Sequence, residues 1–313
     1  MINRQRIIFM GTPDFAVPSL KALHNYGHEV VLVVTQPDRP RGRGKKILFS
    51  PVKEAALALG YDILQPLSVK TPEFYEKAAA LSPDIFVVIA FGQILPKNIL
   101  SIPEKGAINL HASLLPKYRG PAPIQRAIIN MEKETGVTSM LMNEGLDTGD
   151  ILLSSKTEIS SRETSSSLHD RLSRIAGDLL IMTLSGMSTN SIKPVSQDDS
   201  LATYAPMLKK KDGLIDWSKP AEEIEAFIRG MTPWPGAFTF IVSKRLKIFA
   251  SDVVFSNSKE DPGSVIGDAR DKLFIATGKN LLSIKEIQEE SGKRLSIRDY
   301  LRGSNISPGT IFG

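Results

Sequence analysis

Two polar side chains alternate at the end of a short apolar run, where both could act on one substrate. Asn109 and His111 are two residues apart, so on the strand that Ala107–Leu110 predicts they point to the same face. An imidazole accepts protons near neutral pH, since the unperturbed pKa of a histidine side chain is about 6.5. An amide N–H can stabilise a negatively charged oxygen. The pair fits general-base chemistry, and it fits a hydrogen-bonded structural pair equally well.

A second polar cluster supplies a carboxylate. The run Asn143-Glu-Gly-Leu-Asp-Thr-Gly-Asp150 is a glycine-rich loop between two strand-like runs. Asp147 in this loop could orient the imidazole of His111 and fix its tautomer. Asn, His and Asp together form a set for acyl transfer without a covalent nucleophile. From the residues alone, this is one hypothesis among several.

The other three histidines fit structural roles better. His24 and His28 lie four residues apart, a spacing that can hold a metal ion on a helix, but Gly27 lies between them. The segment is typical of a helix end with solvent-facing histidines. His169 lies in a predicted amphipathic helix over Ser166–Leu184, where a surface or partly buried position is expected. We therefore predict no metal site.

Strand-like and helix-like segments alternate over roughly the first 185 residues. Apolar runs at Ile7–Met10, Val30–Thr35 and Asp84–Phe91 suit strands of a parallel sheet that is covered on both faces. Each predicted helix opens with proline, which is tolerated at the first helical position. These helices are Pro51–Leu59, Pro72–Leu81 and Pro121–Asn130. The alternation predicts an α/β fold with a Rossmann-like, doubly wound, mostly parallel sheet, which binds ligands at the carboxyl ends of its strands.

The pattern changes after the polar segment Ser185–Ser200, which contains Gly, Pro and several serines without periodicity. One predicted helix, Ala221–Arg229, is followed by short β-rich runs between turns, which is typical of a small β-barrel. These runs are Ala237–Val242, Arg245–Ala250, Leu273–Thr277 and Leu281–Ile287. We predict an α/β domain over residues 1–188, a linker over 189–206 and an OB-like β-barrel domain over 207–313.

The composition excludes several classes of protein. The chain has 313 residues, 42% hydrophobic and 23% charged, which suits two folded domains rather than a disordered chain. No apolar run approaches the ~18–20 residues that span a bilayer, and Ile7–Met10 is too short for a secretory signal. The chain has no cysteine, which excludes disulfides and thiol nucleophiles and favours a cytoplasmic location. Gly11-Thr-Pro lacks the G-x-G-x-x-G fingerprint, so a Rossmann oxidoreductase is disfavoured.

Positive charge is concentrated in one short segment. The formal net charge is +5, and the run Asp38–Lys46 (DRPRGRGKK) holds five basic residues and one acidic residue. We call this run the basic segment. A charge run is most often a solvated loop, but this one also fits an acidic partner, and its glycines would let it order on binding. Lys209–Lys211 adds three consecutive lysines.

Six motifs occur in order along the chain. They are Gly11-Thr-Pro-Asp-Phe, the basic segment, Phe91-Gly-Gln-Ile-Leu-Pro, Asn109-Leu-His-Ala-Ser-Leu-Leu-Pro, Arg119-Gly-Pro-Ala-Pro-Ile-Gln and Gly145-Leu-Asp-Thr-Gly-Asp, and Trp234-Pro-Gly follows later. In these motifs, nearly end to end, the sequence closely resembles the methionyl-tRNA formyltransferases of the folate-dependent formyltransferase family. The His-x-Ser-Leu-Leu-Pro and Asp-Thr-Gly elements are common to that whole family, so they identify the chemistry better than the acceptor. The basic segment and the second domain point to tRNA.

The resemblance implies an activity and a set of residues. It implies transfer of a formyl group from 10-formyltetrahydrofolate to the α-amine of methionyl initiator tRNA in translation initiation, without a metal. The implied catalytic residues are Asn109, His111 and Asp147. The implied folate-binding residues are Ser113, Leu114, Leu115 and Pro116, with backbone near Phe91–Leu95 and Met142–Leu146 meeting the pterin.

The resemblance also implies how the partner is bound. Contacts with tRNA are expected from Arg39, Arg41, Arg43, Lys45 and Lys46, with Arg43 the main contact. Lys209, Lys210 and Lys211 fit a phosphate clamp or plain solvated surface. We expect a monomer that does not bind membranes. Two alternatives stay open: a formyltransferase that acts on a sugar nucleotide or purine precursor, and an RNA-binding protein on a degenerate formyltransferase fold, against which the complete Asn-His-Asp set argues.

Overall fold

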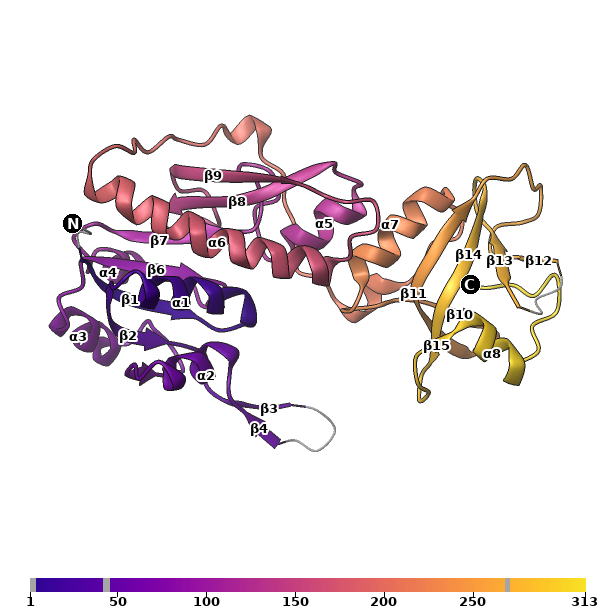
Figure 1. Cartoon of the computed structure of the whole chain (residues 1–313), viewed down its shortest axis with the longest axis horizontal. Helices are drawn as coiled ribbons and strands as arrows, with labels where there is room; N and C mark the ends of the chain where they lie inside the picture. The colour runs from indigo at the N-terminus through magenta and orange to yellow at the C-terminus, as the bar shows by residue number, and fades with distance from the viewer. Residues whose placement is uncertain (1–3, 42–45, 268–270) are drawn as a thin grey trace. The chain divides into compact units, whose positions relative to one another are not determined.

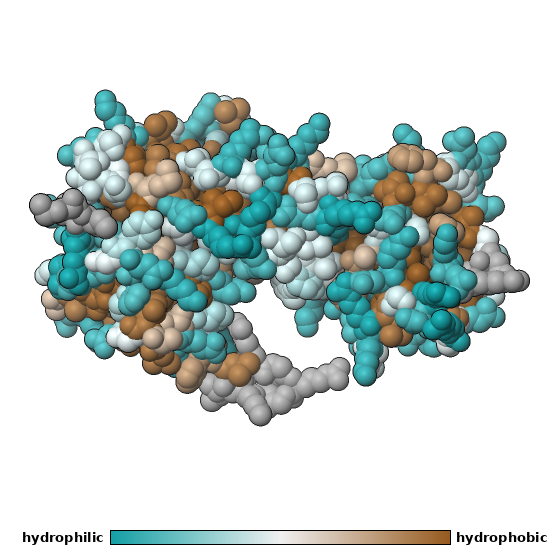
Figure 2. Space-filling model, viewed as in Figure 1, coloured by the Kyte–Doolittle hydropathy of each residue, from teal (hydrophilic) through white to brown (hydrophobic). Residues whose placement is uncertain are grey.

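The chain folds into two compact units. The computed structural model describes residues 4–41, 46–267 and 271–313. The first unit comprises residues up to 120, 135–157 and 169–205, and the second comprises 121–134, 158–168 and 206–313. Two stretches of the first 188 residues thus group with the C-terminal part, while most of the segment that we interpreted as a linker groups with the first unit. Figure 2 shows hydrophobic patches interspersed with hydrophilic surface on the face in view.

The first unit is built on one seven-stranded sheet (Figure 1). Its strand order is β5-β2-β1-β6-β7-β8-β9, with β5, β2, β1, β6 and β7 parallel to one another and β8 antiparallel to β7. The strands are β1 Arg6–Gly11, β2 Glu29–Val34, β5 Ile63–Leu64, β6 Ile85–Ile89, β7 Ala107–His111, β8 Glu134–Leu141 and β9 Ile151–Glu158. The expected Rossmann-like, mostly parallel sheet is confirmed.

Helices cover both faces of this sheet. Every second residue along β1 and β2 points to one face, and Met10 and Val34 on this face pack with Phe74 of α3 and Ile99 of α4 in one buried cluster. On the other face α1 and α6 lie side by side, where Gly177 approaches the Pro18 carbonyl (Figure 1). The helices are α1 Val17–Asn25, α2 Pro51–Ala58, α3 Pro72–Ala80, α4 Lys97–Leu100 and α6 Ser165–Ser188, with a 3-10 turn η1 at Asp14–Ala16.

Local sequence explains where two of these helices begin. The Ser50 hydroxyl accepts a hydrogen bond from the Lys53 amide, and the Thr71 hydroxyl accepts one from the Phe74 amide. Each cap is followed directly by proline, which lacks the amide hydrogen that a first helical position leaves unpaired. The predicted starts of α2 and α3 at Pro51 and Pro72 are therefore confirmed.

The histidines near the end of α1 differ from one another. His24 is exposed as expected, and its Nδ1 lies 2.8 Å from the Tyr61 hydroxyl. His28 was expected to face solvent and is instead buried, and burial lowers its pKa. The expectation was wrong because Gly27 turns the chain out of the helix, so His28 leads directly into β2 rather than lying on the exposed helix surface.

After α6 the chain returns along the first unit instead of leaving it. Val195 and Ile151 exchange two backbone hydrogen bonds of 2.8 and 2.9 Å, which attach the segment to β9. Further on, the Arg119 amide donates to the Thr203 carbonyl at 2.8 Å and the Ala205 amide donates to the Arg119 carbonyl at 2.7 Å. We call residues 195–205 the strap. It includes the 3-10 turn η2, Asp199–Leu201.

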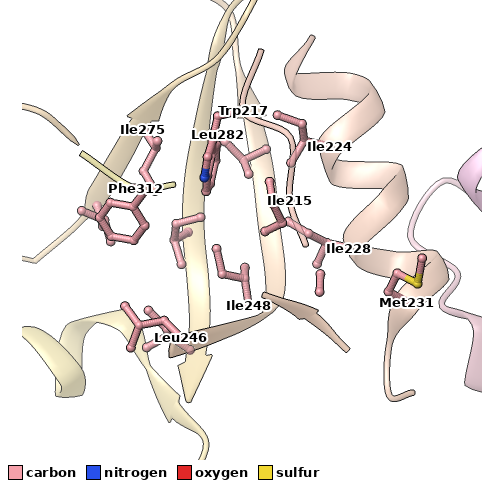
Figure 3. Close-up of a cluster of buried hydrophobic side chains, with 14 of the residues drawn as sticks. Ile215, Trp217, Ile224, Ile228, Met231, Leu246, Ile248, Ile275, Leu282 and Phe312 are labelled. Atoms are coloured by element: carbon pink, nitrogen blue, oxygen red, sulfur yellow. The ribbon is translucent and has the colours of Figure 1, made fainter. Parts of the chain in front are cut away.

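The second unit packs helices against an antiparallel sheet. Its sheet has the order β10-β11-β14-β13-β12 with β15 on β14, which confirms the expected class of an OB-like, curled β-domain. Figure 3 shows the core, where Ile224 and Ile228 of α7 face Ile248 and Leu282 of the sheet. Its elements are α5 Pro123–Ile129, η3 Lys210–Gly213, α7 Ala221–Met231, β10 Ala237–Ile241, β11 Lys244–Val254, β12 Val265–Ile266, β13 Leu273–Ala276, β14 Leu281–Glu289, β15 Leu295–Ser296 and α8 Ile297–Gly303.

Candidate active site

Asn109 and His111 lie at the carboxyl end of β7. The strand pairs in parallel with β6, where Val88 is the partner of Asn109, and His111 is the last residue of the strand. Asn109 is half-buried and His111 is 7% exposed. The two side chains share one face of the sheet, as their spacing predicts, at the edge where parallel α/β sheets bind ligands.

Contacts between its own residues help to fix the loop that carries Asp147. The Asn143 side-chain oxygen accepts hydrogen bonds from the Gly145 amide (3.0 Å) and from the Thr148 hydroxyl (2.8 Å). At Gly149 a Cβ atom would lie 1.6 Å from the Leu141 carbonyl oxygen, so only glycine fits there. Asp147 itself has a φ of 54°, in the left-handed region.

Asp147 contacts both of the other candidate catalytic side chains. Its Oδ1 accepts a hydrogen bond from Asn109 Nδ2 at 3.3 Å. Its Oδ2 accepts one from the Gly120 amide at 2.8 Å and lies 3.5 Å from His111 Nδ1. Asp147 is thus in contact with two residues of β7 that lie far from it in the sequence, and both carboxylate oxygens have partners.

A backbone oxygen decides which imidazole nitrogen of His111 carries the proton. His111 Nε2 lies 2.8 Å from the Tyr118 carbonyl oxygen, which can only accept, so Nε2–H donates to it. In the neutral imidazole Nδ1 is then unprotonated, and it faces the Asp147 carboxylate. The tautomer is therefore fixed by Tyr118, whereas the residue pattern assigned that role to Asp147. What Asp147 can do is stabilise the imidazolium once Nδ1 takes up a proton.

The four expected folate-binding residues form a tight turn directly after β7. Ser113 is buried, and its hydroxyl donates to the Lys117 carbonyl at 2.6 Å. Thr138 of β8 ties the turn down, since its hydroxyl donates to the Ser113 carbonyl (2.7 Å) and accepts from the Leu115 amide (3.1 Å). Leu115 is also buried, while Leu114 and Pro116 are half-buried.

A cavity of about 330 Å³ opens at the same edge of the sheet. Residues that follow the carboxyl ends of β1, β2 and β6 line it, and Ala90 lies two positions beyond Val88, the partner of Asn109. The Phe91 carbonyl accepts from the Thr12 hydroxyl (3.0 Å) and from Gln36 Nε2 (3.3 Å), which joins the three strand ends. The lining residues are Thr12, Pro13, Gln36, Pro37, Asp38, Arg39, Leu48, Phe49, Ser50, Ala90, Phe91 and Gly92.

The two segments expected to meet the pterin each present one exposed apolar side chain. Ile94 is 69% exposed between the buried Phe91 and Leu95. Leu146 is 59% exposed, next to Asp147. The Gln93 side chain accepts from the Val69 amide at 2.9 Å, which anchors the segment that carries Ile94.

Part of the basic segment forms a short hairpin. Strands β3 (Arg39–Arg41) and β4 (Lys46–Leu48) pair antiparallel, with Arg41 opposite Lys46. Arg43 and Lys45, which were also expected to contact tRNA, lie outside the described residues. Arg39 is exposed.

A polar network lies beside the base of this hairpin. Lys53 forms an ion pair with Asp38 and donates a hydrogen bond to Gln65 Oε1 at 2.7 Å. Gln65 Nε2 in turn donates to Asp38 Oδ1 at 2.9 Å. The hydrogen bond from Lys53, followed by that from Gln65, lowers the pKa of Asp38, so the carboxylate stays charged in the network.

Three further features concern the run of lysines, metal ligands and membrane-spanning helices. Lys209, Lys210 and Lys211 are exposed near the start of residues 206–313, the longest part of the second unit, where η3 begins. Among the residues that the structure describes, no three histidine, aspartate or glutamate side chains come together to hold a metal ion. Within the same residues, no helix is long and apolar enough to cross a membrane.

Four residues of the site carried no role in the sequence analysis. Tyr118 and Gly120 act through backbone groups, which leave no trace in residue identity. Arg119 stood in one of the quoted motifs without a function, and Gln197 lay in the predicted linker. In the structure Gln197 donates a hydrogen bond to the Asp147 carbonyl, and Arg119 donates one to Gln197.

Comparison with known proteins assigns the chain to a class. The chain belongs to the formyl transferase family: the formyl transferase model matches residues 5–184, and the formyl transferase C-terminal domain model matches residues 207–305. Within this family it is similar to the methionyl-tRNA formyltransferase of Caldanaerobacter subterraneus subsp. tengcongensis, with 52% identity over 98% of this chain and 99% of the relative. It is 51% identical to that of Citrifermentans bemidjiense, over 98% and 96% of the two chains.

Solved structures share the fold at much lower identity. The N-formyltransferase from Helicobacter canadensis has a TM-score of 0.67 and 21% identity, over 91% of this chain and 99% of its own. The sugar 3N-formyl transferase WlaRD has a TM-score of 0.66 and 20% identity, over 93% and 100%. HypX from Aquifex aeolicus has a TM-score of 0.65 and 16% identity, over 98% of this chain and 49% of its own. These likenesses establish the fold of the chain.

Proposed function

We propose that this protein transfers a formyl group from 10-formyltetrahydrofolate to the α-amine of methionyl initiator tRNA, which yields N-formylmethionyl-tRNA for translation initiation. Relatives named methionyl-tRNA formyltransferase support the proposal, because they are about half identical to this chain over nearly its whole length. The observation that carries it is the contact of Asn109, His111 and Asp147 at the carboxyl edge of the sheet.

The three side chains fit the charge changes of this transfer. A C–N bond forms between the amine and the formyl carbon, and the C–N bond to the folate nitrogen breaks. The folate nitrogen keeps the electron pair of the broken bond and takes up the proton that the amine has lost, which His111 passes on. His111 Nδ1 takes the amine proton, because its Nε2 is already committed to the Tyr118 carbonyl. Asp147 stabilises the resulting imidazolium from 3.5 Å. Asn109 Nδ2 keeps one hydrogen for the carbonyl oxygen, since its other contact is to Asp147.

We infer that the formyl donor binds against the turn after β7 and the two segments that carry exposed apolar side chains. Ile94 and Leu146 offer apolar surface to a flat pterin ring, and the turn Ser113–Pro116 lies directly after β7, which carries Asn109 and His111. We assign the cavity between the ends of β1, β2 and β6 to the acceptor end of the tRNA. No resident metal takes part.

We assign tRNA binding to the basic segment and to the second unit. The hairpin β3–β4 presents the arginine- and lysine-rich segment, in which Arg39, Arg41, Arg43, Lys45 and Lys46 would contact phosphates. The division of labour follows the predicted domains, with catalysis in residues 1–188 and tRNA contact in residues 207–313 in addition to the basic segment. We further propose that the protein is a cytoplasmic monomer.

A single-turnover assay with several acceptors tests the proposal. Wild-type protein with 10-formyltetrahydrofolate should formylate initiator methionyl-tRNA faster than elongator methionyl-tRNA, at a stated salt concentration because phosphate contacts are salt-dependent. His111→Ala should lose about 10²- to 10⁴-fold in rate, the usual share of a general base. His24→Ala, which removes an exposed histidine bonded to Tyr61, is the matched control and should keep the wild-type rate.

Two outcomes would contradict the proposal. Faster formylation of an amino-sugar nucleotide or of a purine precursor amine would keep the chemistry and replace the acceptor. Binding of tRNA without any formyl transfer would make the chain an RNA-binding protein on a formyltransferase fold.

A further inference from the structure

Arg119 is a charged side chain in an unusually buried position. It is 2% exposed, and it lies between the turn after β7 and the strap. Its guanidinium donates to Gln197 Oε1 from Nε (3.0 Å) and from Nη2 (2.8 Å), and Nη2 also donates to Asp199 Oδ1 at 2.8 Å. A buried charge needs such partners, so Arg119 fixes the Gln197 side chain in one orientation.

Gln197 uses every hydrogen-bonding position of its amide. Its Oε1 accepts both bonds from Arg119, and its Nε2 donates to the Asp147 carbonyl at 2.9 Å and to the Gly149 carbonyl at 2.7 Å. If the amide were flipped, its NH2 group would face the Arg119 donors and its oxygen would face the two loop carbonyls. The hydrogen-bond partners therefore determine the orientation of the amide. One of these carbonyls is that of Asp147 itself, and the other belongs to Gly149, where the loop requires glycine.

We propose that Gln197, held in place by Arg119, is a positioning residue that keeps the Asp147 carboxylate in reach of Asn109 and His111. The proposal rests on the function proposed above, because it assigns a further residue to the same site. The strap brings this residue to the loop from 50 positions further along the chain. The loop is clamped on one side by Asn143 within it and on the other side by Gln197 from outside it.

The chemistry of the clamp calls for glutamine rather than glutamate. The two loop carbonyls accept only, so they need the amide hydrogens of Gln197. Glutamate would still accept both hydrogen bonds from Arg119 but would turn an acceptor oxygen toward both carbonyls. Gln197→Glu should therefore release the loop as fully as Gln197→Ala, although it preserves the size of the side chain.

Amide hydrogen exchange tests the positioning without any assay of activity. The Gly120 amide donates to Asp147 Oδ2 at 2.8 Å, so its protection reports where that carboxylate lies. In Gln197→Ala and Gln197→Glu the Gly120 amide should exchange roughly tenfold faster, as for a lost hydrogen bond. Gln288→Ala is the matched control, since it removes another half-buried glutamine that donates to a backbone carbonyl, that of Gly292. Unchanged exchange at Gly120 in both Gln197 variants would overturn the proposal.

A double-mutant cycle connects the positioning to catalysis. Gln197→Ala should lower kcat by about 10- to 100-fold with KM unchanged, because a small displacement of a catalytic group has that cost. In an Asp147→Asn background the same substitution should cost little more, since the group that it positions is already disabled. Losses that multiply in the double variant, or a rise in KM at constant kcat, would also overturn the proposal.

The two measurements separate this proposal from the proposed function. If the wild-type protein formylates a different amine, the proposed function is wrong, and the double-mutant cycle is then measured with that amine as the acceptor. If it transfers no formyl group, the Gly120 exchange alone decides whether Gln197 positions Asp147.

Discussion

His111 is held by two oxygens that have different roles. The Tyr118 carbonyl accepts a hydrogen bond from Nε2 in both the neutral and the protonated form of His111. The Asp147 carboxylate can accept one from His111 only when Nδ1 is protonated. This arrangement leaves a lone pair on Nδ1, the nitrogen that faces the Asp147 carboxylate, and it fits the role of general base proposed above. Neither the tautomer nor the role of Tyr118 could be predicted from the sequence, because a backbone carbonyl is the same in every residue.

Asn109→Asp tests whether Asn109 Nδ2 donates a hydrogen bond to the oxygen of the formyl group. The substitution keeps the shape of the side chain, removes the donor hydrogens and places a second carboxylate 3.3 Å from the Asp147 oxygen. We expect kcat to fall by about 10²- to 10³-fold, the cost of losing one such donor in related chemistry. Single-turnover formylation of methionyl-tRNA measures it.

The matched control is Asn98→Asp, the same substitution at an exposed position of α4. It adds the same charge and should leave kcat near the wild-type value. A wild-type kcat in Asn109→Asp would contradict the proposed role of Asn109.

At the scale of elements, regular segments were predictable and irregular ones were not. Buried apolar runs and proline starts located β1, β2, β6, β7, α2 and α3 within a few residues. The hairpin β3–β4 was not predicted, because a segment of Pro, Arg and Gly has no β pattern. The strap was interpreted as a linker for a similar reason. Its polarity serves contacts with Arg119 and the Asp147 loop, which local periodicity cannot reveal.

The network at the base of the hairpin predicts an acid dependence of stability. The pKa of Asp38 is held below its ordinary value of 3.8, chiefly by the hydrogen bond from Lys53. A carboxyl group whose pKa is lower in the folded state stabilises the fold above its unfolded-state pKa, and this contribution is lost as the pH falls through the folded-state pKa. In Asp38→Asn that contribution is absent at every pH. Wild type and variant should therefore differ in unfolding midpoint at about pH 6 and converge below about pH 4.

Urea unfolding over this pH range measures the effect. Asp178→Asn, at an exposed position of α6, serves as the control and should run parallel to wild type. A difference for Asp38→Asn that stays constant down to about pH 3 would contradict the prediction.

For the whole molecule, the net charge of +5 says less than its distribution. Five of the basic residues fall in the nine positions of the basic segment, and three more are consecutive at Lys209–Lys211. Exposed charges act over roughly 10 Å at moderate salt, so local clusters matter more for binding a polyanion than the average over the surface.

The salt dependence of tRNA binding tests this distribution. Replacing Arg39, Arg41, Arg43, Lys45 and Lys46 by glutamine should weaken binding and make the plot of log K against log salt shallower. Each phosphate contact that is lost should reduce the slope by about 0.7 to 0.9. Fluorescence anisotropy at several salt concentrations measures the slope.

A parallel variant with glutamine at Lys209, Lys210 and Lys211 shows whether these lysines also contact phosphates. An unchanged slope in the first variant would move tRNA binding away from the basic segment. An unchanged slope in the second would leave the three lysines as solvated surface.

The strap has a consequence for how the protein is made. A nascent chain that has emerged to Ser188 already carries Asn109, His111 and Asp147, yet it lacks the residue that secures the carbonyls of the Asp147 loop. During synthesis the hydrogen bonds from Gln197 to this loop can form only after Gln197 has left the ribosome, later than α6 and shortly before residues 206–313 emerge. A fragment that ends after the last turn of α6 would therefore lack the two hydrogen bonds from Gln197 to the Asp147 loop.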